Sequence, residues 1–330
     1  MNNSSVTRPK LGIVVPCFNE EAVLRETTAR LIPLLNRMRD EGLISDRSAI
    51  FYVDDGSRDS TWALIEELSV AYTEICGIKL SRNRGHQNAL LCGLMTAPGD
   101  MLISVDADLQ DDLEVIPQMV RHYQDGCEIV YGVRKRRDTD TFFKRITAEG
   151  YYKLMAAMKV DIVFNHADYR LLSRRALDAL SEYREVNLFL RGLVRLLGYK
   201  SEIVEYDRAE RFAGESKYPL PKMLSFAWQG VTSFSTAPLR LITFMGFFVS
   251  LISIGFALWG LGASLLTNKA LPGWASTVVP MYFLGGIQLL SLGVIGEYVA
   301  KIYMENKGRP RFHVDKLMGC ALRNGLEINQ

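Results

Sequence analysis

The first 135 residues alternate two patterns of hydrophobic positions. Short apolar or β-branched runs, typical of strands that are buried on both faces, are separated by segments with apolar residues at helical spacing. The runs occupy 11–16, 49–53, 77–80, 101–105 and 128–133, and the helical segments occupy 22–38, 60–72, 86–97 and 113–123. Strands that alternate with helices predict an α/β fold with a doubly wound, mainly parallel sheet.

Two much longer apolar segments follow. Residues 241–268 and 270–296 carry no charged side chain, and only Lys269 separates them. Each is longer than the roughly 20 residues that a helix needs to cross a bilayer. Basic residues flank the pair, Arg240 before it and Lys301 after it, so the positive-inside rule predicts a transmembrane hairpin with both ends cytoplasmic. Two buried core helices are the disfavoured alternative, because a soluble core does not need two such lengths in succession.

Two further segments mix aromatic residues and methionine with sparse lysine and arginine, as helices in a membrane interface do. Core packing explains the pattern equally well for 142–160, whereas 218–239 runs directly into the first apolar segment. The amide of Gln288, in the middle of the second span, is expected to bond a neighbouring helix of the same or a second protomer, which leaves a homo-oligomer open. The predicted parts are a folded domain (1–217), an interfacial segment (218–239), a two-helix hairpin (240–302) and a tail (303–330).

Composition narrows the class of protein further. The 330 residues hold 39 basic against 37 acidic side chains, a net charge of +2, which argues against nucleic acid as the main partner. Five cysteines form no CxxC pair, so we interpret them as reduced thiols rather than a disulfide framework or a zinc site. The polar N-terminus lacks the apolar core of a signal peptide, which predicts that the first domain and both termini stay in the cytoplasm.

Ionisable side chains gather after four consecutive predicted strands, where ligands bind in an open parallel sheet. The clusters are 16–21, 54–59, 82–86 and 106–112. Asp106 and Asp108 would point to the same side of an extended segment, where they repel each other unless a cation such as Mg²⁺ or Mn²⁺ lies between them and substrate phosphates. Simple capping of helices or complementing of helix dipoles is expected instead for Asp59, Asp111, Asp112 and Glu114.

Two common nucleotide motifs are absent from the sequence. No GxGxxG follows the first strand and no GxxxxGK[ST] occurs anywhere, which excludes the dinucleotide fingerprint and the P-loop. A metal-bound, phosphate-bearing ligand remains.

The motifs taken together resemble those of family 2 inverting glycosyltransferases. They are VVPCFNEE (14–21), VDDGSRDST (53–61), RNRGHQNALLCGL (82–94), DADLQDD (106–112), HADYRLLSRRAL (166–177) and RFAGESKYP (211–219). The most similar branch is the polyprenyl-phosphate glycosyltransferases, which include dolichyl-phosphate mannose synthases and bacterial bactoprenol glucosyltransferases. The resemblance covers residues 10 to about 312 and implies a GT-A-type catalytic domain in 1–217. The Q-x-x-R-W signature of processive synthases is absent.

The resemblance also implies roles for individual residues. The nucleotide pocket would be formed by Pro16, Glu20, Asp54 and Asp55, and the metal on the diphosphate would be held by Asp106 and Asp108. The phosphate contacts would come from Arg134, Arg211 and Lys217. Asp168 matches the aspartate proposed in the family as base or acceptor-positioning group, although its motif reads ADYRL rather than DFRL. A lipid phosphate is already largely ionised at neutral pH and needs little help from a base, so we favour the acceptor-positioning role for Asp168.

The implied reaction is the inverting transfer of one sugar, glucose from UDP-glucose, to undecaprenyl phosphate. It would occur at the cytoplasmic face of the bacterial inner membrane, with the chain as a multi-pass membrane protein and the product a lipid-linked sugar of the kind used in O-antigen modification. Another donor sugar, a modified arabinose or mannose, stays open. A non-catalytic sugar-nucleotide scaffold is disfavoured, because the acidic and basic residues of the motifs are all present.

Overall fold

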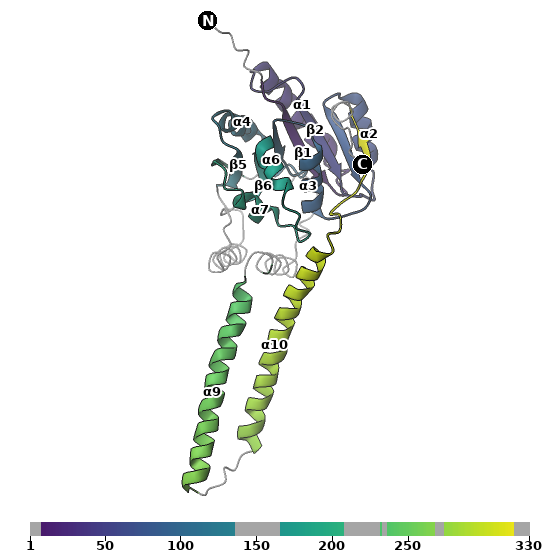
Figure 1. Ribbon diagram of the computed structural model, residues 1–330. Coiled ribbons are helices and arrows are strands. Elements are labelled where there is room, and N and C mark those ends of the chain that lie inside the picture. The colour runs from purple at the N-terminus through teal and green to yellow at the C-terminus, as the bar shows by residue number, and fades with distance from the viewer. Residues whose placement is uncertain (1–7, 136–165, 208–231, 233–235, 268–273, 320–330) are drawn as a thin grey trace. The chain divides into compact units, whose positions relative to one another are not determined.

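The computed structural model describes residues 8–135, 166–207, 232, 236–267 and 274–319 (Figure 1). The chain divides into two compact units. The first unit contains 1–153, 161–219 and 309–330, and the second contains 154–160 and 220–308. The predicted interfacial segments, 142–160 and 218–239, lie for the most part outside the described residues.

An eight-stranded mixed sheet forms the first unit, in the order β7-β5-β6-β4-β1-β2-β3-β8. The strands are β1 (Leu11–Cys17), β2 (Ala49–Asp54), β3 (Ile75–Leu80), β4 (Met101–Ser104), β5 (Ile129–Arg134), β6 (His166–Ser173), β7 (Ser201–Tyr206) and β8 (Val314–Met318). Neighbours pair in parallel except that β6 is antiparallel to both β4 and β5, and β8 is antiparallel to β3. All five predicted strands are confirmed, while β6, β7 and β8 were not predicted.

Helices cover both faces of this sheet. They are α1 (Leu24–Asp40), α2 (Thr61–Ala71), α3 (His86–Thr96), the short η1 (Leu113–Val115), α4 (Ile116–Gln124), α6 (Arg174–Ser181) and α7 (Leu190–Leu196). Leu11, Ile13 and Val15 of β1 share one core cluster with residues of α1, α2 and α4. Successive side chains of a strand alternate between faces, and Val14 lies against α3 on the other one. A Cβ on Gly93 would stand 2.4 Å from Val14, so glycine permits this close helix–sheet approach.

Two long apolar helices make up the described part of the second unit. They are α9 (Ala237–Thr267) and α10 (Trp274–Asn306), which bear many exposed large apolar side chains, among them Phe244, Phe247 and Leu289. Within the described residues one segment, Phe283–Asn306, has the length and hydropathy of a membrane span. The predicted two-span hairpin is therefore not confirmed and stays a prediction. Gln288 is exposed on α10.

The chain after α10 differs from the simple tail predicted for 303–330. After α10 ends at Asn306, the chain returns to the first unit, where β8 pairs with β3. Arg311 Nη1 also donates to the carbonyl oxygen of Tyr183 at 3.0 Å, and Ser81 N donates to that of His313 at 3.0 Å. The strand escaped prediction because its five residues, VDKLM, include two charged side chains and are half-exposed or exposed.

The end of β8 generates a prediction about stability. Gly319 has φ +103°, and a Cβ there would lie 2.8 Å from Cys76 Sγ and 2.9 Å from the carbonyl oxygen of Ile75. Gly126, at φ +86°, has open space around the same position. Both alanine variants lose about 1–2 kcal/mol through the left-handed backbone, but Gly319→Ala should lose more because it also pushes β8 away from β3. Thermal unfolding of the purified chain measures this; equal losses in the two variants would contradict it.

Candidate active site

The loops after β1 and β2 are bound to each other at the carboxyl ends of their strands. Asn19 N donates to Ser57 Oγ at 2.9 Å, and Arg58 N donates to Asn19 Oδ1 at 2.9 Å. Glu20 N donates to Thr61 Oγ1 at 2.9 Å. Asn19 adopts a left-handed backbone, φ +55°, a conformation that asparagine tolerates better than most residues. These bonds fix the position of Glu20 beside the second strand.

The paired aspartates that follow β2 have different partners. Asp54 Oδ1 accepts a hydrogen bond from Ser57 N at 3.0 Å, and its Oδ2 is buried with no partner among the described residues. Both oxygens of Asp55 are occupied, by Arg84 N at 2.7 Å and Gly85 N at 2.9 Å. Burial raises the pKa of Asp55. Asp55 therefore holds the loop after β3, while Asp54 keeps an unsatisfied oxygen. Pro16 is buried beside them in β1.

Asp106 and Asp108 follow β4, as predicted, and a strained residue comes directly after them. Leu109 is buried and has φ +57°, a left-handed conformation that costs a leucine about 1–2 kcal/mol. Asp108 Oδ1 accepts a hydrogen bond from Gln110 N at 3.2 Å. Burial raises the pKa of Asp106, and the negative charges of Asp168 and Asp108 raise it further. A site that resists the ionisation of its carboxylates in this way favours a bound cation.

Asp168 lies on β6, next to β4, and is held by two guanidinium groups. Its Oδ1 accepts hydrogen bonds from Arg170 Nη2 and, at 3.3 Å, from Arg191 Nε, and its Oδ2 accepts one from Arg191 Nη2 at 3.2 Å. Burial alone would raise the pKa of Asp168, but the charges of Arg191 and Arg170 outweigh it and hold the pKa well below its usual value. With its pKa lowered in this way, Asp168 is expected to stay ionised at neutral pH and to be a poor proton acceptor.

His86, the first residue of α3, lies between the two carboxylate groups. Its Nε2 is 3.6 Å from Asp106 Oδ1 and 3.7 Å from Asp168 Oδ2. The neighbouring Gln87 accepts a hydrogen bond from Leu190 N at 3.0 Å, which fixes the start of α7 and hence Arg191. Sequence reasoning placed His86 in the predicted cluster 82–86 without a role of its own, and it did not single out Arg170 or Arg191. Arg170 could have been found, since residues two apart on a strand share a face and Arg170 follows Asp168 at that spacing.

Asp111 forms a second network, with Arg134 and Tyr206. The Tyr206 hydroxyl donates to Asp111 Oδ1 and accepts from Arg134 Nε at 3.2 Å; Arg134 Nη2 lies 3.5 Å from Asp111 Oδ1. Burial, aided by the charge of Asp106, raises the pKa of Asp111 to about 6. The prediction that Asp111 simply complements a helix dipole does not describe its contacts, because its side chain is buried against Tyr206 and Arg134. Asp112 caps η1 instead, accepting from Glu114 N at 2.9 Å.

The donor set suits a hard divalent cation. Carboxylate oxygens are ligands that Mg²⁺ and Mn²⁺ prefer, and Mg²⁺ is commonly held by one or two carboxylates together with substrate phosphates. Within the described ranges no group of three or more His, Cys, Asp or Glu side chains is placed to hold a metal. Asp106 and Asp108 therefore fit a metal that substrate oxygens help to bind. Arg211 and Lys217 lie outside the described residues.

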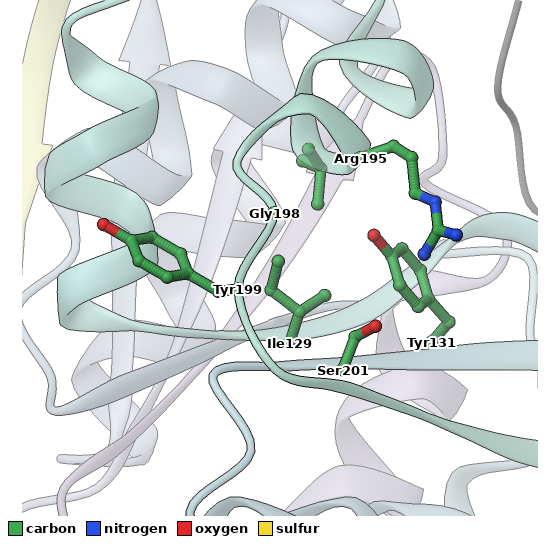
Figure 2. Close-up of a pocket in the computed structure, with 7 residues that line it drawn as sticks. Ile129, Tyr131, Arg195, Gly198, Tyr199 and Ser201 are labelled. Atoms are coloured by element: carbon green, nitrogen blue, oxygen red, sulfur yellow. The ribbon is translucent and has the colours of Figure 1, made fainter.

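A cavity of about 300 Å³ lies elsewhere in the first unit. Its lining contains Ile129, Tyr131, Val194, Arg195, Gly198, Tyr199 and Ser201, which come from β5, α7, the loop after α7 and the start of β7 (Figure 2). Arg134 and Tyr206 stand at the opposite ends of the same two strands. None of the predicted site residues that the structure describes lines this cavity.

Comparison with known proteins identifies the class. The family model "Glycosyl transferase family 2" matches residues 12–181, so the chain belongs to the family 2 glycosyltransferases and is an enzyme that transfers a sugar. The predicted GT-A-type α/β fold is confirmed as a mixed sheet.

Individual relatives extend over nearly the whole chain. It is 51% identical over 313 residues to the uncharacterized glycosyltransferase YkoT of Bacillus subtilis, covering 94% of this chain and 92% of that one. It is 39% identical over 310 residues to the bactoprenol glucosyl transferase of Shigella phage SfII, covering 93% and 98%. A solved structure of glucosyl-3-phosphoglycerate synthase from Mycobacterium tuberculosis aligns at a TM-score of 0.46 and 20% identity, covering 68% and 76%, a likeness that says nothing about substrate.

The pKa of Asp111 predicts a pH-dependent difference in stability. Because its pKa is raised in the folded state, folded protein binds this proton more tightly than the unfolded chain does, and stability is lost as the pH rises through 6. Asp111→Asn lacks this titration. We therefore compare the free energy of unfolding of Asp111→Asn with that of wild type, both in EDTA. The variant's value minus the wild-type value should rise by about 2 kcal/mol from about pH 4.5 to about pH 7.5. Denaturant unfolding at the two pH values measures it; a constant difference would contradict it.

Proposed function

We propose that this enzyme transfers one sugar, with inversion, from a nucleoside diphosphate sugar to undecaprenyl phosphate at the cytoplasmic face of the bacterial inner membrane. The observation that carries the proposal is the meeting of the Asp106 and Asp168 carboxylates at His86. This contact supports the proposal because Asp106 is the predicted metal ligand and Asp168 the predicted acceptor-side group. The bactoprenol glucosyl transferase relatives support a polyprenyl phosphate acceptor and favour UDP-glucose as the donor.

The donor would lie along the carboxyl ends of β1, β2, β4 and β5. Its base and ribose would contact the corner that contains Pro16, Glu20, Asp54 and Asp55. Its phosphates would meet Arg134, whose side chain is 24% exposed, together with Arg211 and Lys217. A Mg²⁺ or Mn²⁺ ion held by Asp106 and Asp108 would supply charge neutralisation for the departing nucleoside diphosphate.

Asp168 would act on the transferred sugar as an anion. A phosphate monoester has a second pKa near 6, so the attacking lipid phosphate needs little help from a base. Glycosyl transfer develops positive charge at the anomeric carbon, as in other oxocarbenium-like transition states. A carboxylate that Arg170 and Arg191 keep ionised stabilises that charge and fixes the side from which the acceptor approaches.

Membrane attachment would bring the lipid acceptor to this site. The exposed apolar surfaces of α9 and α10, and the uncharged runs 241–268 and 270–296, support a two-span hairpin with cytoplasmic termini. Association of protomers through these helices stays open. The alternative of a non-catalytic scaffold is disfavoured, because the chain belongs to a family of enzymes.

A donor panel tests the proposal. Purified protein is incubated with undecaprenyl phosphate and radiolabelled UDP-glucose, GDP-mannose or a UDP-linked modified arabinose, and label is counted in the organic phase. We expect one labelled lipid, formed from UDP-glucose, with the anomeric configuration opposite to that of the donor. Label entering only with a different nucleotide sugar would replace the donor assignment, and no labelled lipid from any donor would refute the acceptor assignment.

The metal assignment makes a separate prediction. Activity should vanish in EDTA and return with Mg²⁺ or Mn²⁺, and Asp108→Asn should lower turnover at least about 100-fold, because a neutral amide cannot replace a charged metal ligand. Asp125→Asn is the matched control, since Asp125 is exposed at the end of α4. Steady-state kinetics with both variants provide the measurement. Full activity after exhaustive chelation would exclude the metal.

A further inference from the structure

Tyr206 lies outside the family-matched segment 12–181, yet it reaches the candidate site. It ends β7, in parallel register with Arg134 at the end of β5, and it is 2% exposed. Its ring packs edge-on against that of Tyr169, with centroids 5.3 Å apart and an interplanar angle of 83°. The Tyr169 hydroxyl is itself bonded to the backbone oxygen of Asp112 at 2.9 Å. The position of the Tyr206 hydroxyl is thus fixed from two sides.

That hydroxyl lies between two oppositely charged side chains. A tyrosine hydroxyl donates one hydrogen bond and can accept others, and this one donates to Asp111 while it accepts from Arg134 Nε. Arg134 Nη2 stays 3.5 Å from Asp111, beyond a short two-point ion pair. The Nε edge of the guanidinium is therefore held, and the side chain still keeps 24% of its surface exposed.

We propose that Tyr206 is a positioning residue that, together with Asp111, orients Arg134 toward the diphosphate of the donor. The inference rests on the donor site of the proposed function. Without the hydroxyl, Arg134 loses the partner of its Nε and can close directly onto Asp111, where it pairs with a buried carboxylate instead of a ligand. A phenylalanine at 206 fills the same space, so the hydroxyl, not the ring, carries this role.

The test is Tyr206→Phe in the full-length enzyme. We expect the dissociation constant of UDP measured with Mn²⁺, and the KM of the donor, to rise about tenfold, as for loss of a hydrogen bond to a charged group. The KM of undecaprenyl phosphate should not change. Tyr52→Phe is the control, because it removes an equally buried hydroxyl that bonds Thr28 Oγ1 at 2.7 Å in the core.

A double-mutant cycle separates positioning from general damage. If Tyr206 acts through Arg134, adding Tyr206→Phe to Arg134→Lys should cause little further loss in UDP binding. If Tyr206→Phe unfolds, Asp111→Ala replaces it, because this variant removes the acceptor that holds the Tyr206 hydroxyl beside Arg134. It should produce the same donor-selective loss. Unchanged UDP binding in Tyr206→Phe, additive losses in the cycle, or equal losses for donor and acceptor would overturn the inference. UDP binding by wild type without any sugar transfer would refute the proposed function and leave this test intact.

Discussion

Several carboxylates lie close together at the edge of the sheet where β4 and β6 meet, and arginine side chains from neighbouring elements compensate their negative charge. Asp106, Asp111 and Asp168 are all at least partly buried, and arginines pair with two of them, Asp111 and Asp168. Arg170 comes from the same strand as Asp168, Arg191 from α7 and Arg134 from β5. Removing one partner from a buried ion pair costs about 3–5 kcal/mol, so the elements that carry these arginines are fixed in place by the carboxylates as well as by packing.

The antiparallel strand β6 makes this arrangement possible. It enters between β4 and β5, where its register places Arg170 opposite both Ser104 and Tyr131. A purely parallel sheet would bring only strand carboxyl ends to this edge. Here an antiparallel strand contributes its first residues, His166 to Asp168, at the same edge, and its Asp168 reaches Asp106 through His86. The mixed sheet thus brings the Asp106 and Asp168 carboxylates, which have separate roles in the proposed function, to one edge.

The parts that could be predicted from the sequence depend on local pattern. The five buried strands are continuous apolar runs, and the acidic DADLQDD segment follows one of them, so both were visible in the sequence. The strands β7 and β8, at the two edges of the sheet, mix polar with apolar residues and give a weak signal. Arg191 and Tyr206 gain meaning only through tertiary contact, since no spacing in the sequence connects them to Asp168 or Asp111. For the same reason the sequence predicted only a helix-dipole role for Asp111.

The return of the chain in β8 has a consequence for the order of assembly. β8 forms the outer edge of the sheet beside β3, yet it follows both long helices in the chain. During synthesis, β3 therefore presents an unpaired edge until α9 and α10 have been made. The sheet that carries the site is completed only by the last part of the chain that the structure describes.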